Sequence, residues 1–273
     1  MGRNKKVLDF THLSWSLSRQ SSGTAGSYLK SYEVADGIKY YYKMSNFDSV
    51  RGVIGHESIN EIIVQNIAEI LEIPHLHYEL IHGEVSIGGK RYETWLTKSR
   101  DFKDPGERKL TFESFYEINR MDGESVWQLI ERNEMEQYFY EMFLLDYIIC
   151  NRDRHGANIE VLEHRGAYRL APLFDHGISL LAPCMNDVDK MKNFDLRKDG
   201  PVNNFVGSMN LSENLKLVPN HMLETAAGKV FSREHIFAGL EEAIGAVPEE
   251  FWNIIEEMVR ERINHVKEIC NQG

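Results

Sequence analysis

Three polar residues in a largely apolar part of the chain have the types and spacing of a phosphoryl-transfer site. Asp153 and Asn158 lie five positions apart in a polar loop, and Asp175 follows after a short hairpin. An Asp can orient an attacking hydroxyl and accept its proton, while an Asn and a second Asp supply hard oxygen ligands to Mg²⁺ on nucleotide phosphates. The loop alone is equally compatible with an Asx-rich surface turn. Asp175, directly behind an apolar strand, favours the chemical interpretation.

The hydrophobic pattern predicts the elements that position these residues. Residues 138–150 are apolar on nearly every side, which predicts a buried helix that leads into the interior. Residues 151–158 are polar, which predicts a loop that leaves the core. Residues 159–162 and 168–170 have the pattern of two short strands around a turn, and the second strand delivers Asp175.

The N-terminal part begins with a small, polar stretch at residues 21–27 and continues into a predicted hairpin. Residues 28–34 and 38–44 have the pattern of strands around Asp36-Gly37, and Asp-Gly between extended runs is a strong hairpin signal. A Gly/Ser-rich turn before such a hairpin can bring backbone N–H groups close to phosphates. From the pattern alone, a flexible linker is the simpler interpretation of residues 21–27.

Lys43 ends the aromatic second strand, where it could hold the α and β phosphates of a nucleotide. A lysine in this place is more usually a solvated strand end. To hold phosphates it needs a carboxylate, and residues 56–72 provide candidates on an amphipathic helix that ends before Pro74. Glu57 and Glu61 lie one turn apart on this helix, so either could reach Lys43, and at least one of them is expected to be solvated.

A second predicted hairpin, residues 76–87 and 90–97, turns through Gly88-Gly89. The polar stretch that follows predicts a hinge, in which backbone groups of residues 96–99 would meet an adenine edge. These elements predict an α+β chain with two lobes. Residues 1–100 would form a small lobe of antiparallel sheet and helix, and residues 101–273 a mainly helical lobe.

Composition limits the class of protein. The chain has 273 residues, of which 42% are hydrophobic and 27% charged, as in a globular protein with a sizeable core. Its net charge of −11 argues against unguided binding to DNA or to an anionic membrane. Three cysteines form no disulfide framework and indicate reduced thiols in the cytoplasm. No stretch has the pattern of a signal peptide or the roughly 20 apolar residues of a membrane span.

Two stretches resemble the catalytic and metal-binding segments of HipA-like serine/threonine kinases. They are Asn151-Arg-Asp153-Arg-His155-Gly-Ala-Asn158 and Leu173-Phe-Asp175-His-Gly177. Similar D-x-H-x-x-N loops occur in phosphatidylinositol kinases and in aminoglycoside or choline phosphotransferases. All of these groups share a two-lobed, kinase-like fold, so the resemblance defines fold and chemistry better than substrate.

The N-terminal half adds to this resemblance. Its residues Ser22-Gly-Thr-Ala25-Gly26-Ser-Tyr-Leu-Lys30 are similar to the S-x-A-G-x-Q-x-K phosphate loop of the family, with the Gln replaced. Asn60-Glu61 and Ile73-Pro74 match the N-E and G-I-P marks of the family helix, with Glu72 in place of the family Gly. The resemblance therefore selects Glu61 as the partner of Lys43.

The resemblance implies an α+β, two-lobed, protein-kinase-like fold and an ATP- and Mg²⁺-dependent, toxin-type kinase that phosphorylates Ser or Thr of a protein and also itself. Asp153 would orient the acceptor hydroxyl, and Asn158 and Asp175 would bind Mg²⁺. His155 would brace the loop or contact the transferred phosphate. The implied ATP-binding positions are Ser22, Gly23, Thr24, Ala25, Gly26, Lys43, Glu61 and Lys98.

Two regions outside the motifs complete the prediction. Residues 181–219 are long and irregular, and their place after Asp175 is that of an activation or substrate-docking segment. Residues 234–270 predict two helices whose apolar stripe forms lobe core. The family typically has an additional N-terminal subdomain, whereas this sequence starts almost at the phosphate loop. The resemblance therefore implies a kinase core alone, with any antitoxin or regulator encoded separately.

Two alternatives keep the fold and change the function. A lipid or small-molecule kinase would use the same residues on another acceptor, although the acidic charge argues against a membrane substrate. A pseudokinase would keep the fold as a binding module. The presence of the complete set of Lys43, Glu61, Asp153, Asn158 and Asp175 argues against that last interpretation.

Overall fold

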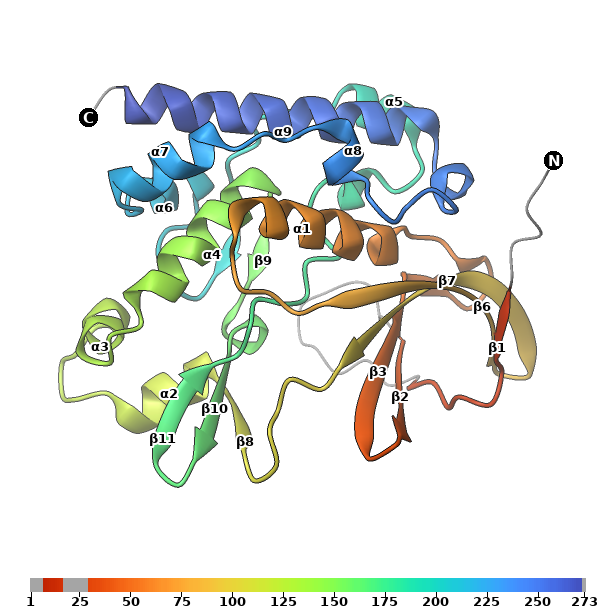
Figure 1. Ribbon diagram of the computed structural model, residues 1–273, viewed down its shortest axis with the longest axis horizontal. Coiled ribbons are helices and arrows are strands. Elements are labelled where there is room, and N and C mark those ends of the chain that lie inside the picture. The colour runs from red at the N-terminus through yellow and green to blue at the C-terminus, as the bar shows by residue number, and fades with distance from the viewer. Residues whose placement is uncertain (1–6, 17–28, 272–273) are drawn as a thin grey trace.

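The computed structural model describes residues 7–16 and 29–271, and it has the α+β organisation that the sequence predicts (Figure 1). A five-stranded sheet occupies one side of the molecule. Helices and a second, three-stranded sheet make up the rest, and the long C-terminal helix lies along the edge opposite the sheets (Figure 1).

The five-stranded sheet is built around the two predicted hairpins. Its order is β1 (Leu8–Phe10), β6 (Tyr78–Ile87), β7 (Lys90–Arg100), β3 (Ile38–Met44) and β2 (Lys30–Ala35). All neighbours are antiparallel except β1, which pairs in parallel with β6 and was not predicted. Asp36-Gly37 and Gly88-Gly89 have positive φ at both turn positions, as tight primed hairpin turns require. A short β4 (Phe47–Asp48) and β5 (Gly52–Val53) pair with each other.

Helix α1 (Glu57–Leu71) lies between this sheet and the C-terminal helices (Figure 1). Four of its isoleucines (Ile59, Ile62, Ile63 and Ile67) are buried and Ile70 is partly buried, as the predicted apolar stripe requires. On the far side, the amide nitrogen of Asn66 donates to the carbonyl oxygens of Ile236 and Ala238, both at 3.0 Å. The helix therefore shares a hydrophobic core with the later part of the chain as well as supporting the sheet. The division into residues 1–100 and 101–273 stays a prediction.

The middle of the chain contains helices and the second sheet. Helices α2 (Phe112–Asn119), α3 (Val126–Arg132) and α4 (Glu136–Ile148) come first, and α4 is the predicted buried helix. The sheet has the order β11 (Ala167–Leu170), β10 (Glu160–His164) and β8 (Arg108–Thr111). Strands β10 and β11 form the predicted hairpin, whereas β8, which follows the stretch expected to be a polar hinge, was not predicted.

Residues 181–219 are more ordered than the sequence predicts. They contain a 3₁₀ turn (Ala182–Cys184), α5 (Val188–Lys192), β12 (Asn203–Asn204) and α6 (Leu211–Leu215). Strand β12 pairs in parallel with β9 (Asp153–Arg154), so this segment folds back onto the predicted catalytic loop. A second 3₁₀ turn, Gly156–Asn158, closes that loop.

The C-terminal helices form the predicted core. They are α7 (Asn220–Gly228), α8 (Arg233–Ile236), a 3₁₀ turn (Ile244–Ala246) and α9 (Glu249–Cys270). The apolar stripe of α9 is buried against the rest of the molecule. Within the described residues, no helix is both long enough and apolar enough to cross a membrane.

Helix α1 ends at a residue whose backbone favours glycine. Glu72 has φ 60° and ψ 31°, and its N–H donates to the carbonyl oxygens of Ala68 and Glu69. A side chain in this left-handed conformation costs about 1–2 kcal/mol. The carboxylate of Glu72 also lies 2.7 Å from the Lys229 ammonium at the surface.

We predict that Glu72→Gly is more stable than Glu72→Ala by about 1 kcal/mol. Both variants lose the Lys229 ion pair, so their difference isolates the backbone conformation. Urea unfolding monitored by circular dichroism measures this difference. Equal midpoints in the two variants would contradict a strained cap at this position.

Candidate active site

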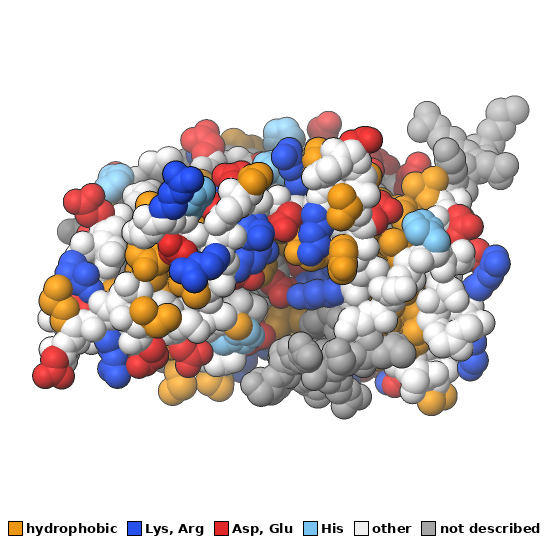
Figure 2. Space-filling model, turned by 90° about the horizontal axis from the view of Figure 1, so that it is seen from below, with side chains coloured by type: hydrophobic (Ala, Val, Ile, Leu, Met, Phe, Trp, Pro, Cys, Tyr) orange, Lys and Arg blue, Asp and Glu red, His pale blue; other side chains and the backbone are white. Residues whose placement is uncertain are grey.

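A pocket of about 270 Å³ opens where the five-stranded sheet faces the middle of the chain. Its walls include Lys43 on β3, Thr97 on β7 and Asp175 behind β11. Its lining also includes apolar and aromatic side chains, among them Leu76 and Tyr78, and further charged ones, among them Lys109 and Glu160. Figure 2 views the molecule from below and shows basic and acidic side chains side by side around a recess near the middle of that face.

Lys43 lies between two carboxylates at the inner end of this pocket. Its Nζ is 3.0 Å from Oε1 of Glu61 and also donates a hydrogen bond to the carboxylate of Asp175. Burial by itself lowers the pKa of Lys43, but the carboxylates of Asp175 and Glu61 outweigh burial and raise this pKa well above its usual value. The lysine is therefore held in its charged form out of bulk water.

Lys43 contacts Glu61 and not Glu57. The side chain of Glu61 is fully buried, and its Oε2 accepts a hydrogen bond of 3.0 Å from the backbone N–H of His176. Glu57 is also buried, but its carboxylate accepts a hydrogen bond of 2.9 Å from the N–H of Asn46. The expectation that one of the two glutamates is solvated is therefore wrong.

Asp175 has an unusual backbone conformation for a residue with a side chain. Its φ is 61°, and its N–H donates to the hydroxyl of Tyr78 at 3.3 Å. Oδ2 lies 3.8 Å from the ammonium of Lys30. Burial acts to raise the pKa of Asp175, but Lys43 and Lys30 outweigh it and hold this pKa far below its usual range. Backbone strain of this kind is concentrated at functional sites.

The loop after α4 positions Asp153 with contacts from both sides. Oδ1 of Asp153 accepts a hydrogen bond of 2.9 Å from the amide nitrogen of Asn203 on β12. The amide nitrogen of Asn158 donates to the backbone carbonyl of Asp153 at 2.8 Å. Asn203 was not predicted from the sequence, because it lies in a segment that looked irregular.

His155 braces the loop. Its Nδ1 accepts a hydrogen bond of 3.2 Å from the N–H of Ala157, at the start of the 3₁₀ turn. Its Nε2 lies 3.7 Å from Oδ2 of Asp153, which is beyond hydrogen-bond distance. Two roles were predicted for His155, bracing the loop or contacting the transferred phosphate. Its contacts within the loop are those of the first role.

Arg154 connects the loop to the Asp175 segment from inside the core. The guanidinium has no exposed surface and forms two hydrogen bonds, of 2.9 and 2.7 Å, with the carboxylate of Asp146 on α4. Its Nη1 donates to the carbonyl oxygens of Phe174, at 3.1 Å, and Asn158, at 3.3 Å. Burial alone lowers the pKa of Arg154, but the Asp146 carboxylate outweighs it and raises this pKa above the usual value. The sequence signal that could have indicated this pair is Asp146, because an acidic residue inside an apolar helix needs a charged or hydrogen-bonding partner.

Among the other predicted ATP-binding positions, Lys98 lies away from the pocket. Lys98 points to the opposite face of β7 from Thr97, where its Nζ lies 3.7 Å from the carboxylate of Glu79 and 4.6 Å from the ring centre of Tyr40. The phosphate-loop positions Ser22, Gly23, Thr24, Ala25 and Gly26 lie outside the described residues. Lys30, the last residue of that motif, lines the pocket.

The fold has the arrangement of a kinase-like protein, and comparison with a solved structure agrees. The chain resembles the crystal structure of the proinflammatory kinase CtkA of Helicobacter pylori, with a TM-score of 0.61 and 15% identity over 98% of this chain and 99% of that chain. It also resembles HipA of Shewanella oneidensis MR-1 in a complex with HipB and operator DNA, with a TM-score of 0.49 and 14% identity over 94% of this chain and 68% of that one. No family model and no curated protein matches the sequence. The likeness to CtkA shows that the fold is kinase-like, as the motifs predict.

We predict that Asp146→Ala lowers the free energy of unfolding by about 3–5 kcal/mol, because it leaves the Arg154 charge buried without its partner. Chemical unfolding in urea measures this loss. The matched control is Glu261→Ala, which removes a carboxylate 3.4 Å from Arg197 at the surface and is expected to change the urea midpoint little. If the two variants unfold at similar urea concentrations, Arg154 is not held by Asp146.

Proposed function

We propose that this protein is an ATP- and Mg²⁺-dependent kinase that transfers the γ-phosphate of ATP to Ser or Thr of a protein. The observation that carries the proposal is the partly buried contact of Lys43 with Glu61 and Asp175 at the end of a pocket. The Asp153 loop is tied to the same segment through Arg154. Phosphoryl transfer depends on positioning and on charge neutralisation, and both are provided by this arrangement.

Lys43 is the residue that would bind the phosphates of the substrate ATP. In the structure its charge is balanced by two carboxylates, so it can contact phosphate oxygens while Glu61 keeps its position. Glu61 is suited to this task because the backbone of His176 fixes its second oxygen. Lys30, on the neighbouring strand, would add a second cation near the same phosphates.

Asp175 and Asn158 would hold Mg²⁺. Both offer the hard oxygen ligands that this ion prefers. Lys43 and Lys30 lower the pKa of Asp175, so its carboxylate stays in the ionised form that can coordinate a metal ion. The side-chain nitrogen of Asn158 is bound to the Asp153 carbonyl, and its Oδ1 has no hydrogen bond within the described part of the chain. Bound Mg²⁺ would neutralise phosphate charge.

Asp153 would orient the acceptor hydroxyl. The hydroxyl oxygen forms the new bond to the γ-phosphorus, the bond from phosphorus to the oxygen of the leaving ADP breaks, and the Asp153 carboxylate takes the hydroxyl proton. Its hydrogen bond from Asn203 keeps one oxygen fixed, which leaves the other for the acceptor.

The acceptor and the biological setting are further parts of the proposal. The resemblance of the motifs supports a protein Ser or Thr, including residues of the kinase itself, and a toxin-type role with a separately encoded antitoxin or regulator. A cytoplasmic location is supported by the three cysteines, all of which are unpaired.

The first test is the intact mass of the purified protein after incubation with ATP and Mg²⁺, beside Asp153→Asn. We expect the mass to increase by phosphate only in the wild-type protein, because the side-chain amide of Asp153→Asn cannot accept the proton of the acceptor hydroxyl. The same incubation without Mg²⁺ should show no gain. Equal gains in both proteins would remove Asp153 from the mechanism.

Absence of any gain would count against self-phosphorylation, and a lipid and aminoglycoside panel would then test the small-molecule alternative. ATP binding without transfer to any acceptor would support the pseudokinase alternative.

We predict that Asn203→Ala slows transfer by about 10- to 150-fold while the KM for ATP is unchanged, because a hydrogen bond to a charged group contributes about 1.5–3 kcal/mol. Initial rates of phosphate incorporation at several ATP concentrations measure both quantities. The control is Asn204→Ala, since the amide of this adjacent residue donates to the Ser208 carbonyl and does not contact Asp153. A loss of equal size in the control would assign the effect to the segment and not to the Asp153 contact.

A further inference from the structure

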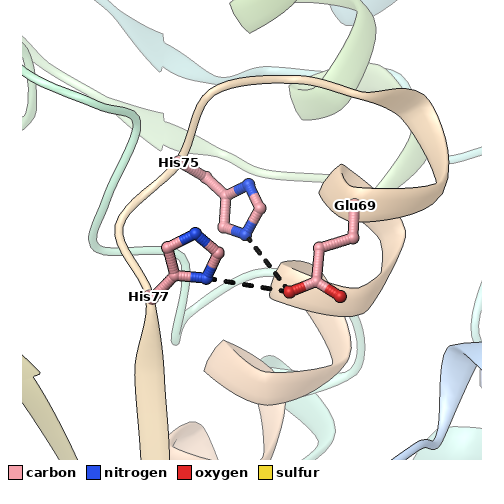
Figure 3. A group of neighbouring side chains, drawn as sticks. All are labelled: Glu69, His75 and His77. Carbon is pink, nitrogen blue, oxygen red and sulfur yellow. Dashed lines mark ion pairs between the residues drawn. The ribbon is translucent and has the colours of Figure 1, made fainter.

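Three potential metal ligands meet at the C-terminal end of α1, outside the active-site pocket. Glu69 lies on the last turns of the helix, and His75 and His77 lie on the extended chain that leads to β6 (Figure 3). The left-handed Glu72 turns the chain back beside the helix. Because His75 and His77 are two positions apart on extended backbone, their side chains lie on the same side, and both point toward Glu69 (Figure 3).

His75 has the hydrogen bonding of a metal ligand. Its Nδ1 lies 2.7 Å from the carbonyl oxygen of Ile73. A carbonyl oxygen only accepts hydrogen bonds, so Nδ1 carries the proton and Nε2 presents a lone pair. Ligating histidines in proteins are commonly held in this way by a backbone carbonyl. The side chain is only 7% exposed, and its Nε2 is buried without a hydrogen-bond partner.

The unpartnered nitrogen points at the other two ligands. Nε2 of His75 lies 3.9 Å from Oε1 of Glu69, and Nδ1 of His77 lies 3.7 Å from the same oxygen. All three ligand atoms lie within 4.8 Å of one another. Tetrahedral zinc with bonds of about 2.0–2.2 Å needs its ligand atoms roughly 3.4 Å apart. The Glu69 and His77 side chains are at least half exposed, which leaves them room to move toward this spacing.

We propose that Glu69, His75 and His77 bind a divalent transition-metal ion, with Zn²⁺ as the ion the donor set fits best. Two imidazole nitrogens and one carboxylate oxygen are ligands of borderline metals, whereas Mg²⁺ and Ca²⁺ prefer oxygen alone. Three protein ligands leave a fourth position for water. Burial lowers the pKa of His75, which keeps its imidazole neutral and able to coordinate at neutral pH.

The ion would connect α1 to the segment that carries Asp175. Leu76, between the two histidines, donates its N–H to the Leu173 carbonyl at 2.8 Å, and Leu173 donates to the Pro74 carbonyl at 3.3 Å. Leu76 also lines the active-site pocket. A metal on the flanking histidines would therefore fix the end of the helix that carries Glu61 against the chain two residues before Asp175.

Isothermal titration of the chelator-treated, full-length protein with ZnCl₂ tests the site. We expect saturable binding of one Zn²⁺ per chain in the unmodified protein. His77→Ala and Glu69→Gln should each weaken this binding at least tenfold. Both side chains are at least half exposed, so these variants are expected to fold, and circular dichroism checks this. The matched control is His221→Ala, an exposed histidine on α7, which should bind as the unmodified protein does.

A second readout reports coordination directly. Co²⁺ in the same site should give visible absorption bands of tetrahedral intensity, and these bands should be absent in His77→Ala. Lack of saturable Zn²⁺ binding, or unchanged binding in His77→Ala and Glu69→Gln, would overturn the proposal. Neither titration needs ATP or an acceptor, so the result is independent of the proposed kinase activity.

Discussion

The charge of Arg154 has no access to water, and the arrangement of the whole candidate site follows from how that charge is compensated. Its planar fork donates to Asp146 in a core helix and to carbonyl oxygens in two other segments. One side chain thereby joins the helix, the loop of Asp153 and Asn158, and the residue before Asp175. A lysine could not replace it, because a single ammonium lacks the fixed, planar set of donors. Under the proposed function, the distances between the reacting groups would therefore be set from behind the site, by a side chain that lies in the core.

In the pocket the charges are reversed, because here a cation compensates carboxylates that are removed from water. Glu61 is a fully buried carboxylate and Asp175 a partly buried one, and Lys43 is the cation that compensates both. Without a ligand, the lysine and the carboxylates satisfy one another. Under the proposed function, phosphates and a metal ion would enter as a second matched pair, so that no charge in the site is left without a partner at any stage.

Local signals in the sequence predicted much of this structure. The Asp36-Gly37 and Gly88-Gly89 turns, the buried helix α4 and the hairpin before Asp175 depend on nearby residues only, and each is present. Strands β8 and β12 were missed because they are short and polar, and they form only when distant partners are in place. Asn203 could not be recognised for the same reason, since nothing near it in the sequence indicates the carboxylate to which it donates. Lys98 was predicted to bind ATP but points away from the pocket, whereas its neighbour Thr97 lines the pocket. A shift of one residue along a strand reverses the face to which a side chain points, and the sequence does not show which residue faces the pocket.

The pairing of β12 with β9 limits how this part of the protein can evolve. A surface loop that is attached only at its ends can gain or lose residues at little energetic cost. Residues 181–219 are also attached near their middle, where Asn203 must remain in register with Asp153. Changes of length are therefore expected to accumulate on either side of β12, while the ladder itself stays constant, so that one long loop varies as two shorter ones.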